Sequence, residues 1–151
     1  MNNSCPDKYI IAFIDTENVP SNCFSGLASL VEYKYKNHKN AGYYCYGIDD
    51  EKSTVSCGWK QQTDKLKGLK WVSVKGEREK NLVDNSIIKD IKKLLETPKF
   101  SRIDIWVIVT SDGDYESAIR LIMSKGHKVV IASNRLVSDK FFKLGCEIYR
   151  L

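Results

Sequence analysis

The sequence predicts a three-layer α/β fold, in which helices cover both faces of a central parallel sheet of about five to six strands. Short apolar runs alternate along the chain with segments whose apolar residues recur every three or four positions. The runs at residues 9–14 and 103–110 are nearly uninterrupted, as expected for strands that are covered on both faces. Strands that alternate with helices favour a parallel sheet with right-handed crossovers.

The first expected strand, residues 9–14, ends in the polar segment Asp15-Thr16-Glu17-Asn18. Pro20 is suited to opening a helix, because its missing N–H would have no partner there, and the apolar spacing continues to Tyr35. We then expect a loop over residues 34–42, a strand over 43–48, a weak helix over 54–66 and a strand over 69–74.

The second half of the chain repeats this alternation. We expect a helix from residue 82 or 84 to about 96, a strand over 103–110, a helix over 115–124, a strand over 127–132, a short helix over 136–144 and a last strand over 146–151. Pro98 ends the first of these helices, and Lys125-Gly126 closes the second in the manner of a C-cap.

Composition indicates one soluble domain over residues 1–151, with 42% hydrophobic and 28% charged residues. No apolar run is long enough for a membrane span, and the polar first eight residues lack signal-peptide features. Five scattered cysteines favour reduced thiols and a cytoplasmic location. The net charge of +5 fits an anionic partner without identifying it as nucleic acid.

Four aspartates stand at the tips of expected elements. Asp15 follows the first strand, Asp112 and Asp114 follow the fourth, and Asp84 lies in the first turn of the preceding helix. If the first and fourth strands are neighbours, these acids converge on one crevice at the carboxyl ends of the strands. Clustered carboxylates repel one another unless a cation neutralises them, which suggests one or two Mg²⁺ or Mn²⁺ ions.

Each acid also has a simpler interpretation when it is taken alone. Asp114 could be only a helix N-cap, and Asp84 could serve only the helix dipole. Other catalytic patterns are missing from the sequence: there is no glycine-rich dinucleotide or P-loop motif, and no serine or cysteine has a plausible histidine partner. The metal hypothesis therefore depends on the four acids together.

Several motifs carry a family resemblance that spans nearly the whole chain. The segments that carry it are Phe13-Ile14-Asp15-Thr16-Glu17-Asn18-Val19, Lys80-Asn81-Leu82-Val83-Asp84, Val109-Thr110-Ser111-Asp112-Gly113-Asp114-Tyr115 and Lys125-Gly126-His127-Lys128-Val129. They resemble, in order and at suitable distances, the motifs of NYN domains, which belong to the PIN-like nuclease group.

The resemblance implies a PIN-like fold, with strand order near 3-2-1-4-5, and metal-dependent ribonuclease activity. It implies that Asp15, Asp84, Asp112 and Asp114 hold Mg²⁺ or Mn²⁺, directly or through water. By the same resemblance, Asn18 orients the first acid or contacts substrate, and Lys80 and Arg78 meet RNA phosphates. Ser111, on the substrate side, stands where the family often has glycine, and Asn81-Leu82 also departs from the family pattern.

The leading hypothesis is an endoribonuclease in which metal-activated water attacks RNA, single-stranded or structured, and leaves a 5′-phosphate and a 3′-hydroxyl. The alternative is a catalytically inactive module of the same fold that binds nucleic acid or a protein. A metal-dependent phosphatase or Toprim-like domain is a third interpretation, which the residues around Asp15 disfavour. A homodimer is left open, and four aromatic residues at strand or helix positions fit the core better than base stacking: Tyr43, Tyr44, Trp59 and Trp71.

Overall fold

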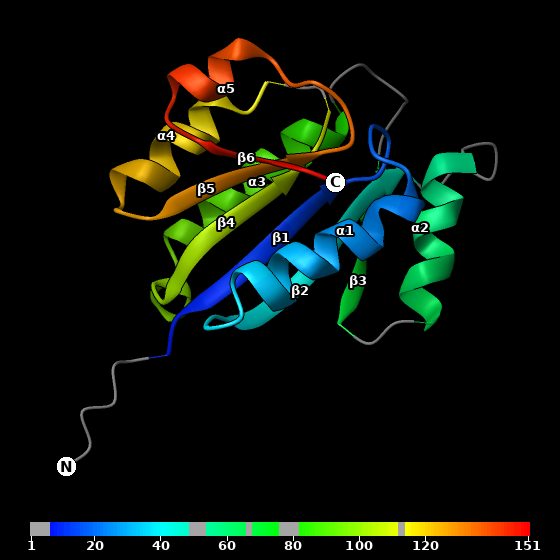
Figure 1. Ribbon diagram of the computed structural model, residues 1–151, viewed down its shortest axis with the longest axis horizontal. Coiled ribbons are helices and arrows are strands. Elements are labelled where there is room, and N and C mark those ends of the chain that lie inside the picture. Colours follow the sequence, from blue (N-terminus) through cyan, green and yellow to red (C-terminus); the bar gives the residue numbers. More distant parts are fainter. Residues whose placement is uncertain (1–6, 49–53, 66–67, 76–81, 112–113) are drawn as a thin grey trace.

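The computed structural model describes residues 7–48, 54–65, 68–75, 82–111 and 114–151. Its centre is a six-stranded sheet with the order β3-β2-β1-β4-β5-β6, in which every neighbouring pair is parallel (Figure 1). The strands are β1 Tyr9–Asp15, β2 Lys39–Ile48, β3 Leu69–Val74, β4 Ile103–Val109, β5 Lys128–Ser133 and β6 Glu147–Arg150. The predicted parallel α/β fold is confirmed, and its strand order extends the expected 3-2-1-4-5 by one strand.

Helices cover both faces of this sheet (Figure 1). They are η1 Ser21–Cys23, α1 Phe24–Ser29, η2 Leu30–Lys34, α2 Thr54–Lys65, α3 Leu82–Leu95, η3 Pro98–Phe100, α4 Glu116–Ser124 and α5 Asp139–Lys143. Buried residues of α3, α4 and α5 form one core with the sheet, whereas those of α1, η2 and α2 form the core on the opposite face. The three-layer arrangement follows from these two cores.

The central strands explain why their sequences are apolar without interruption. In β1, Ile11 and Phe13 face the core of α3 and α4, while Ile10, Ala12 and Ile14 face the opposite core. All five side chains are at most 1% exposed. Because successive side chains of a strand point to opposite faces, a strand with a helix layer on each side must be apolar at every position.

The expectation of a loop over residues 34–42 was wrong for its second part. β2 begins at Lys39, and Lys39 and Asn40 pair with Tyr9 and Ile10 of β1. The ladder with β1 satisfies the backbone groups of these polar residues while their side chains stay exposed at the end of the sheet. A register shift follows, and Gly42 has a φ of 130°, which favours glycine.

The single helix expected between Pro20 and Tyr35 is divided into a 3₁₀ turn, an α-helix and a π-helical turn. In the π-helical turn η2, the Tyr35 N–H donates to Leu30 O, five residues earlier, at 3.2 Å. This turn keeps Leu30 and Val31 buried against the sheet and lets the Tyr35 hydroxyl reach Glu147 in β6, at 2.8 Å. Tertiary packing therefore overrides the simple helical spacing.

Two smaller expectations can be compared with the described residues. Cys23, Cys45 and Cys146 are free thiols, in agreement with the reduced state expected from their scattered positions. Trp59 and Tyr43 are buried core residues, as expected, whereas Tyr44 and Trp71 are only partly buried. In the part of the chain that the structure describes, no helix has the length and apolar character needed to span a membrane.

Candidate metal centre at the carboxyl edge of the sheet

Asp15, the last residue of the central strand β1, is the most enclosed acid of the candidate site. It lies in register with Tyr46 of β2 and is only 1% exposed. The Asn18 side-chain amide donates to Asp15 Oδ2 at 2.7 Å, and the Glu17 backbone N–H donates to Oδ1 at 3.2 Å. The loop that follows β1 therefore folds back so that Asn18 and Glu17 both donate to the carboxylate.

Two hydroxyl groups from the β4 side also reach this carboxylate. Thr110 Oγ1 and the Tyr115 hydroxyl each donate to Asp15 Oδ2, both at 3.3 Å. Thr110 directly follows β4, the neighbour of β1, and Tyr115 is the N-cap residue of α4. The sequence interpretation gave neither residue a role, although both lie inside the motif around the Asp-Gly-Asp segment.

Asp84 brings a second carboxylate to the same region. It lies in the first turn of α3, is 5% exposed, and its Oδ1 accepts the Asn85 backbone N–H at 2.9 Å. Burial, followed by the charge of Asp84, raises the pKa of Asp15 to about 6, against the opposing effect of the hydrogen bonds from Asn18, Glu17 and Thr110. Two buried acids that disfavour each other's charge are suited to binding a cation.

Asp114 occupies a more exposed position than the other two acids. Its side chain is 75% exposed, and Oδ1 lies 3.7 Å from Lys140 Nζ of α5 and accepts the Glu116 backbone N–H at 3.4 Å. The N-cap position of α4 belongs to Tyr115 instead, so the interpretation of Asp114 as the N-cap was displaced by one residue. Asp114 nevertheless lines the same groove as Asp84.

A groove of about 610 Å³ lies between α3 and α4 and brings Asp84 and Asp114 to one surface. Its lining also contains Lys92 of α3 and Arg120 of α4, which the sequence interpretation did not single out. Arg120 forms an ion pair with Glu116 at 2.8 Å, and both Lys92 and Arg120 are exposed. A groove lined by both carboxylates and cations can take a metal ion together with a phosphate.

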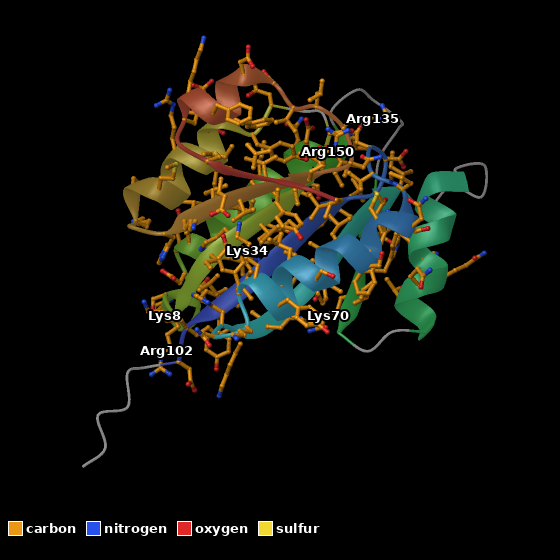
Figure 2. The ribbon with its side chains drawn as sticks, viewed as in Figure 1. Lys8, Lys34, Lys70, Arg102, Arg135 and Arg150 are labelled. Atoms are coloured by element: carbon orange, nitrogen blue, oxygen red, sulfur yellow. The ribbon has the colours of Figure 1, made fainter. Side chains whose placement is uncertain are left out.

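Further cations lie at the carboxyl edge of the sheet. Figure 2 shows Arg135 and Arg150 on the side of the molecule where β1 ends, whereas Lys8 and Arg102 lie on the opposite side, where β1 and β4 begin. Arg150 ends β6 in register with Ser133, the last residue of β5. The modest positive charge of the chain thus includes two arginines on the side of the molecule that carries the candidate centre.

Three of the predicted site residues, Asp112, Arg78 and Lys80, lie outside the described residues. Ser111 is described, and its Oγ donates to the Asn18 backbone carbonyl at 2.8 Å, so it connects the tip of β4 to the loop after β1. Within the described ranges, no three or more His, Cys, Asp or Glu side chains are grouped so that they could hold a metal ion.

The two buried acids fit a hard divalent cation as far as the described residues extend. Asp15 and Asp84 offer carboxylate oxygens, the donors that Mg²⁺ and Mn²⁺ prefer, and burial together with the charge of Asp84 raises the pKa of Asp15. Mg²⁺ commonly uses one or two carboxylates and keeps several waters, so two buried acids match its usual protein ligands.

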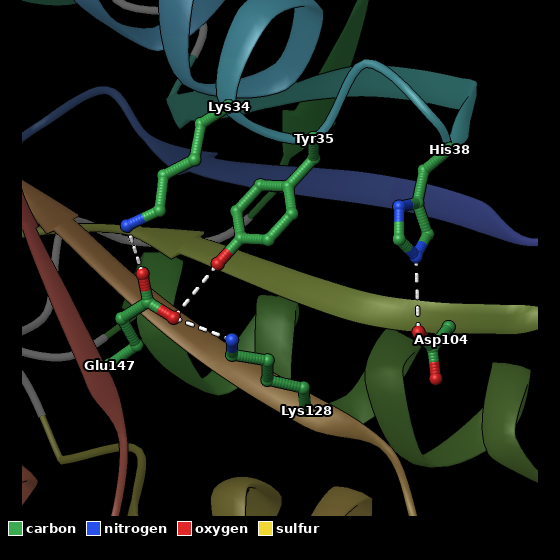
Figure 3. Close-up of polar contacts among 6 residues, drawn as sticks. All are labelled: Lys34, Tyr35, His38, Asp104, Lys128 and Glu147. Atoms are coloured by element: carbon green, nitrogen blue, oxygen red, sulfur yellow. Dashed lines mark hydrogen bonds and ion pairs between the residues drawn. The ribbon is translucent and has the colours of Figure 1, made fainter.

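A second titratable cluster lies away from this edge and has a structural role (Figure 3). Glu147 of β6 accepts hydrogen bonds from Lys34 and from the Tyr35 hydroxyl, and its Oε2 lies 2.6 Å from Lys128 Nζ of β5. Burial alone would raise its pKa, but the bonds from Lys128, Lys34 and Tyr35 outweigh burial and lower it to about 2. The cluster attaches the edge strand β6 to β5 and to the turn at residues 34–35.

Comparison with known proteins gives a matching family model and solved structures with a similar fold. The family model described as "NYN domain" matches residues 9–145. A crystal structure of a protein of unknown function, VPA0982 from Vibrio parahaemolyticus, matches with a TM-score of 0.70 at 15% identity, covering 99% of this chain and 96% of that one. At this identity the likeness concerns the fold alone.

Another solved structure, S. aureus homoserine dehydrogenase, matches with a TM-score of 0.41 at 14% identity, covering 91% of this chain and 29% of that one. No sequence among curated proteins matches significantly.

Proposed function

The chain belongs to the NYN domain family, and we propose that it is a metal-dependent endoribonuclease whose centre is built on Asp15 and Asp84. NYN domains are generally nucleases of the PIN-like superfamily, so a phosphodiester substrate is the natural starting point. The observation that carries the proposal is the pair of buried carboxylates at the carboxyl edge of the sheet, where Asp84 helps to raise the pKa of Asp15. Such a pair is costly to the fold and has a clear use in binding a cation.

We assign the metal ligands to Asp15 and Asp84, with Asp112 and Asp114 completing the set directly or through water. Mg²⁺ or Mn²⁺ bound there would supply an activated water and would stabilise the charge that develops on the phosphate and the leaving oxygen. A bound cation also favours the ionised form of Asp15 and so opposes the burial that raises the pKa of this carboxyl group.

The surrounding residues of the chain would orient the acids and hold the substrate. Hydrogen bonds from Asn18, Thr110 and Tyr115 fix the Asp15 carboxylate in one orientation. Such bonds to a metal ligand set its direction and its basicity. Lys92 and Arg120, along the groove that contains Asp84, would bind the phosphates on either side of the scissile bond.

RNA is proposed over DNA because the NYN domain family resembles ribonucleases of the PIN-like group. Further residues are proposed to bind this substrate. Lys80 and Arg78 would contact RNA phosphates, and Ser111 would contact the substrate. The overall positive charge is consistent with a polyanionic substrate.

The direct test is cleavage of end-labelled single-stranded and hairpin RNA by the purified protein in Mn²⁺, in Mg²⁺ and in EDTA. Asp84→Asn and Asp112→Asn are compared with the wild type. Asp104→Asn is the matched control, because Asp104 lies at the start of β4, far from the carboxyl edge of the sheet, and pairs there with His38. We expect metal-dependent cleavage with a 5′-phosphate on the product, lost in both site variants and retained in the control.

Two results would contradict this proposal. Cleavage by Asp84→Asn at the wild-type rate would show that the buried pair is not the metal centre. RNA that binds in EDTA but is never cut with either metal would favour the alternative function, a catalytically inactive module that binds nucleic acid.

A further inference from the structure

A second cavity, separate from the groove between α3 and α4, lies on the same face of the sheet. It encloses about 420 Å³ between the strands β1, β2 and β3 and the C-terminal half of α3 with η3. The side chains that matter here are Phe13, Tyr44, Tyr46, Asp90, Lys93 and Phe100. A volume of this order is within the range of pockets that bind small organic ligands, so the space is large enough for a nucleotide.

The walls of this cavity are aromatic. Phe13 and Tyr44 stack with ring centroids 6.1 Å apart, and Tyr46 lies against Phe13 with centroids 6.2 Å apart. Phe13 and Tyr46 are buried, whereas Tyr44 and Phe100 are only partly buried and keep part of their surface toward the cavity. The partly exposed rings of Tyr44 and Phe100 can bind flat rings by stacking, and all nucleobases are flat rings.

One carboxylate is fixed at the polar side of the cavity. The Tyr46 hydroxyl donates a hydrogen bond of 2.6 Å to Asp90 Oδ2, which joins β2 to α3. A carboxylate can accept about four hydrogen bonds in all, and this contact uses one of them while setting the direction of the group. Asp90 is half-buried, so its interactions with a ligand would be less weakened by solvent than those of a surface acid.

Lysines complete the mouth of the cavity. Lys93 and Lys99 belong to its lining and are exposed, and Lys99 Nζ lies 5.0 Å from the centroid of the Phe100 ring. Lys70 Nζ lies 5.5 Å from the centroid of the Tyr44 ring. The cavity thus combines an aromatic interior with an acceptor inside and cations outside, which is complementary to a base that carries N–H donors and a phosphate.

We infer that this cavity is a guanine-selective subsite for one nucleotide of an RNA strand, with Asp90 as the residue that reads the base. Guanine presents two adjacent donors, N1–H and the 2-amino group, which a carboxylate can accept as a parallel pair. Adenine and cytosine place an acceptor beside their amino group, and uracil places carbonyls on both sides of its single N–H. Only guanine therefore offers Asp90 two hydrogen bonds without an opposing acceptor.

This inference rests on the proposed function for the RNA strand, but its recognition chemistry is independent of cleavage. Asp90 lies six residues after Asp84 on α3, a distance of about 9 Å along the helix axis. Tyr46 also pairs in register with Asp15. A strand whose scissile phosphate is at Asp84 can therefore place a nearby base in the cavity while Lys93 and Lys99 contact its phosphates.

The first experiment measures binding in EDTA, where no cleavage occurs. Amide NMR spectra of the 151-residue chain are recorded during titration with GMP, IMP, AMP, CMP and UMP. We expect GMP to shift signals of residues 44–46 and 90–100 and to bind at least tenfold more tightly than AMP, CMP or UMP. IMP, which lacks the 2-amino donor, should bind more weakly than GMP, because a bidentate contact becomes a single one.

Two variants separate base reading from stacking. Asp90→Asn retains an acceptor for the Tyr46 hydroxyl but replaces one oxygen with a donor that opposes guanine, so GMP affinity should fall to that of AMP. Tyr44→Leu keeps an apolar side chain but removes the stacking face, so the affinity for all five nucleotides should fall together. Asp104→Asn is the control and should bind GMP as the wild type does, because Asp104 lies at the start of β4 and outside the cavity lining.

The second experiment maps cleavage of oligouridine that contains a single guanosine. The wild type should cut at a fixed distance from the guanosine, and Asp90→Asn should cut without reference to it. Equal affinity for all five nucleotides, shifts confined to other residues, or a cleavage pattern that ignores guanosine would each overturn the inference. Selective GMP binding by a protein that cuts no RNA would instead contradict the proposed nuclease function while supporting the guanine subsite.

Discussion

The Asn18 side-chain amide lies 2.7 Å from Asp15 Oδ2, so a residue three positions after the acid holds it in place. The same loop is closed by the Asn18 and Val19 backbone N–H groups, which both donate to Asp15 O at 3.2 Å. Residues 15–19 therefore form a turn at the end of the central strand β1. Within this turn the Asn18 side chain donates its hydrogen bond to Asp15, the proposed metal ligand.

Replacing Asn18 with alanine should weaken metal binding without unfolding the protein. The backbone bonds of the turn remain, but the Asp15 carboxylate loses its shortest described hydrogen bond and with it part of its fixed orientation. Losses of about 10–100-fold in metal affinity or activity are typical for such partners of metal ligands. Cleavage rate against Mn²⁺ concentration measures the effect, with the exposed Asn22→Ala as control; an unchanged Mn²⁺ dependence would contradict the role of Asn18.

Lys92 and Arg120 should contribute to RNA affinity through charge. Each replacement by alanine is expected to weaken RNA binding by the inactive protein by a similar factor for RNAs of different sequence. It should also reduce the slope of log affinity against log salt concentration by about one. Fluorescence anisotropy of the Asp84→Asn background at several salt concentrations measures both quantities. Lys36→Ala is the control, since this exposed lysine precedes β2 at the opposite edge of the sheet. An equal loss of RNA affinity in the control would show that the groove between α3 and α4 does not bind RNA.

Sequence patterns predicted the strands and the position of Asp15 and Asp84 because both depend on local signals. A strand buried on two faces must be apolar throughout, and its first polar residue marks the carboxyl edge, as Asp15 does. The motif order then placed Asp84 at the start of a helix, and the structure has it in the first turn of α3. The charge of Asp84 acts on Asp15 because α3 packs on the sheet beside β1.

Features that depend on contacts between distant segments could not be predicted in this way. Lys39 and Asn40 look like loop residues, and only their pairing with β1 makes them a strand. Tyr46 and Asp90 are 44 residues apart, and nothing local to either one indicates their hydrogen bond. Lys92 and Arg120 line one groove because α3 and α4 pack side by side on the sheet, which periodicity alone does not specify.

Metal should stabilise the fold, and more strongly at neutral than at acid pH. With Asp15 at a pKa of about 6, most of the carboxylate is protonated at pH 5 and must lose its proton to bind a cation. Metal at 100 times its dissociation constant would add about 2.7 kcal/mol, or roughly 5–10 °C in Tm for a chain of this size. Thermal melts in Mn²⁺ and in EDTA at pH 5 and 7.5 measure this; an equal Tm rise in Asp84→Asn would contradict the assigned centre.

Glu147→Gln should lower stability at neutral pH and remove part of its acid dependence. The folded-state pKa of Glu147, about 2, lies below the ordinary value of 4.5, so its contribution is present above pH 4.5 and is lost as the pH falls toward 2. Lys34 and Lys128 are about half exposed, so solvent screening limits the expected loss to about 1 kcal/mol at pH 7. Urea unfolding at pH 7 and pH 2.5 should show a clearly larger difference in the free energy of unfolding between wild type and variant at the higher pH.

The close approach at Gly47 should make this position intolerant of any side chain. A Cβ there would lie inside van der Waals distance of the Trp71 ring and of Thr16 Oγ1, whose hydroxyl donates to Tyr46 O at 2.9 Å. Overpacking of this kind costs about 1–3 kcal/mol, so Gly47→Ala should lower the free energy of unfolding by that amount.

Gly58→Ala is the matched control for this prediction. Its Cβ would meet Ser21 Oγ at 2.7 Å, a flexible side-chain end that can rotate away, and alanine is favoured over glycine inside a helix such as α2. The two variants should therefore differ in urea midpoint, with Gly47→Ala the less stable. Because Thr16 directly follows Asp15, Gly47→Ala should also weaken Mn²⁺ binding; two variants with equal stability would show that the β2–β3 edge adjusts freely around Gly47.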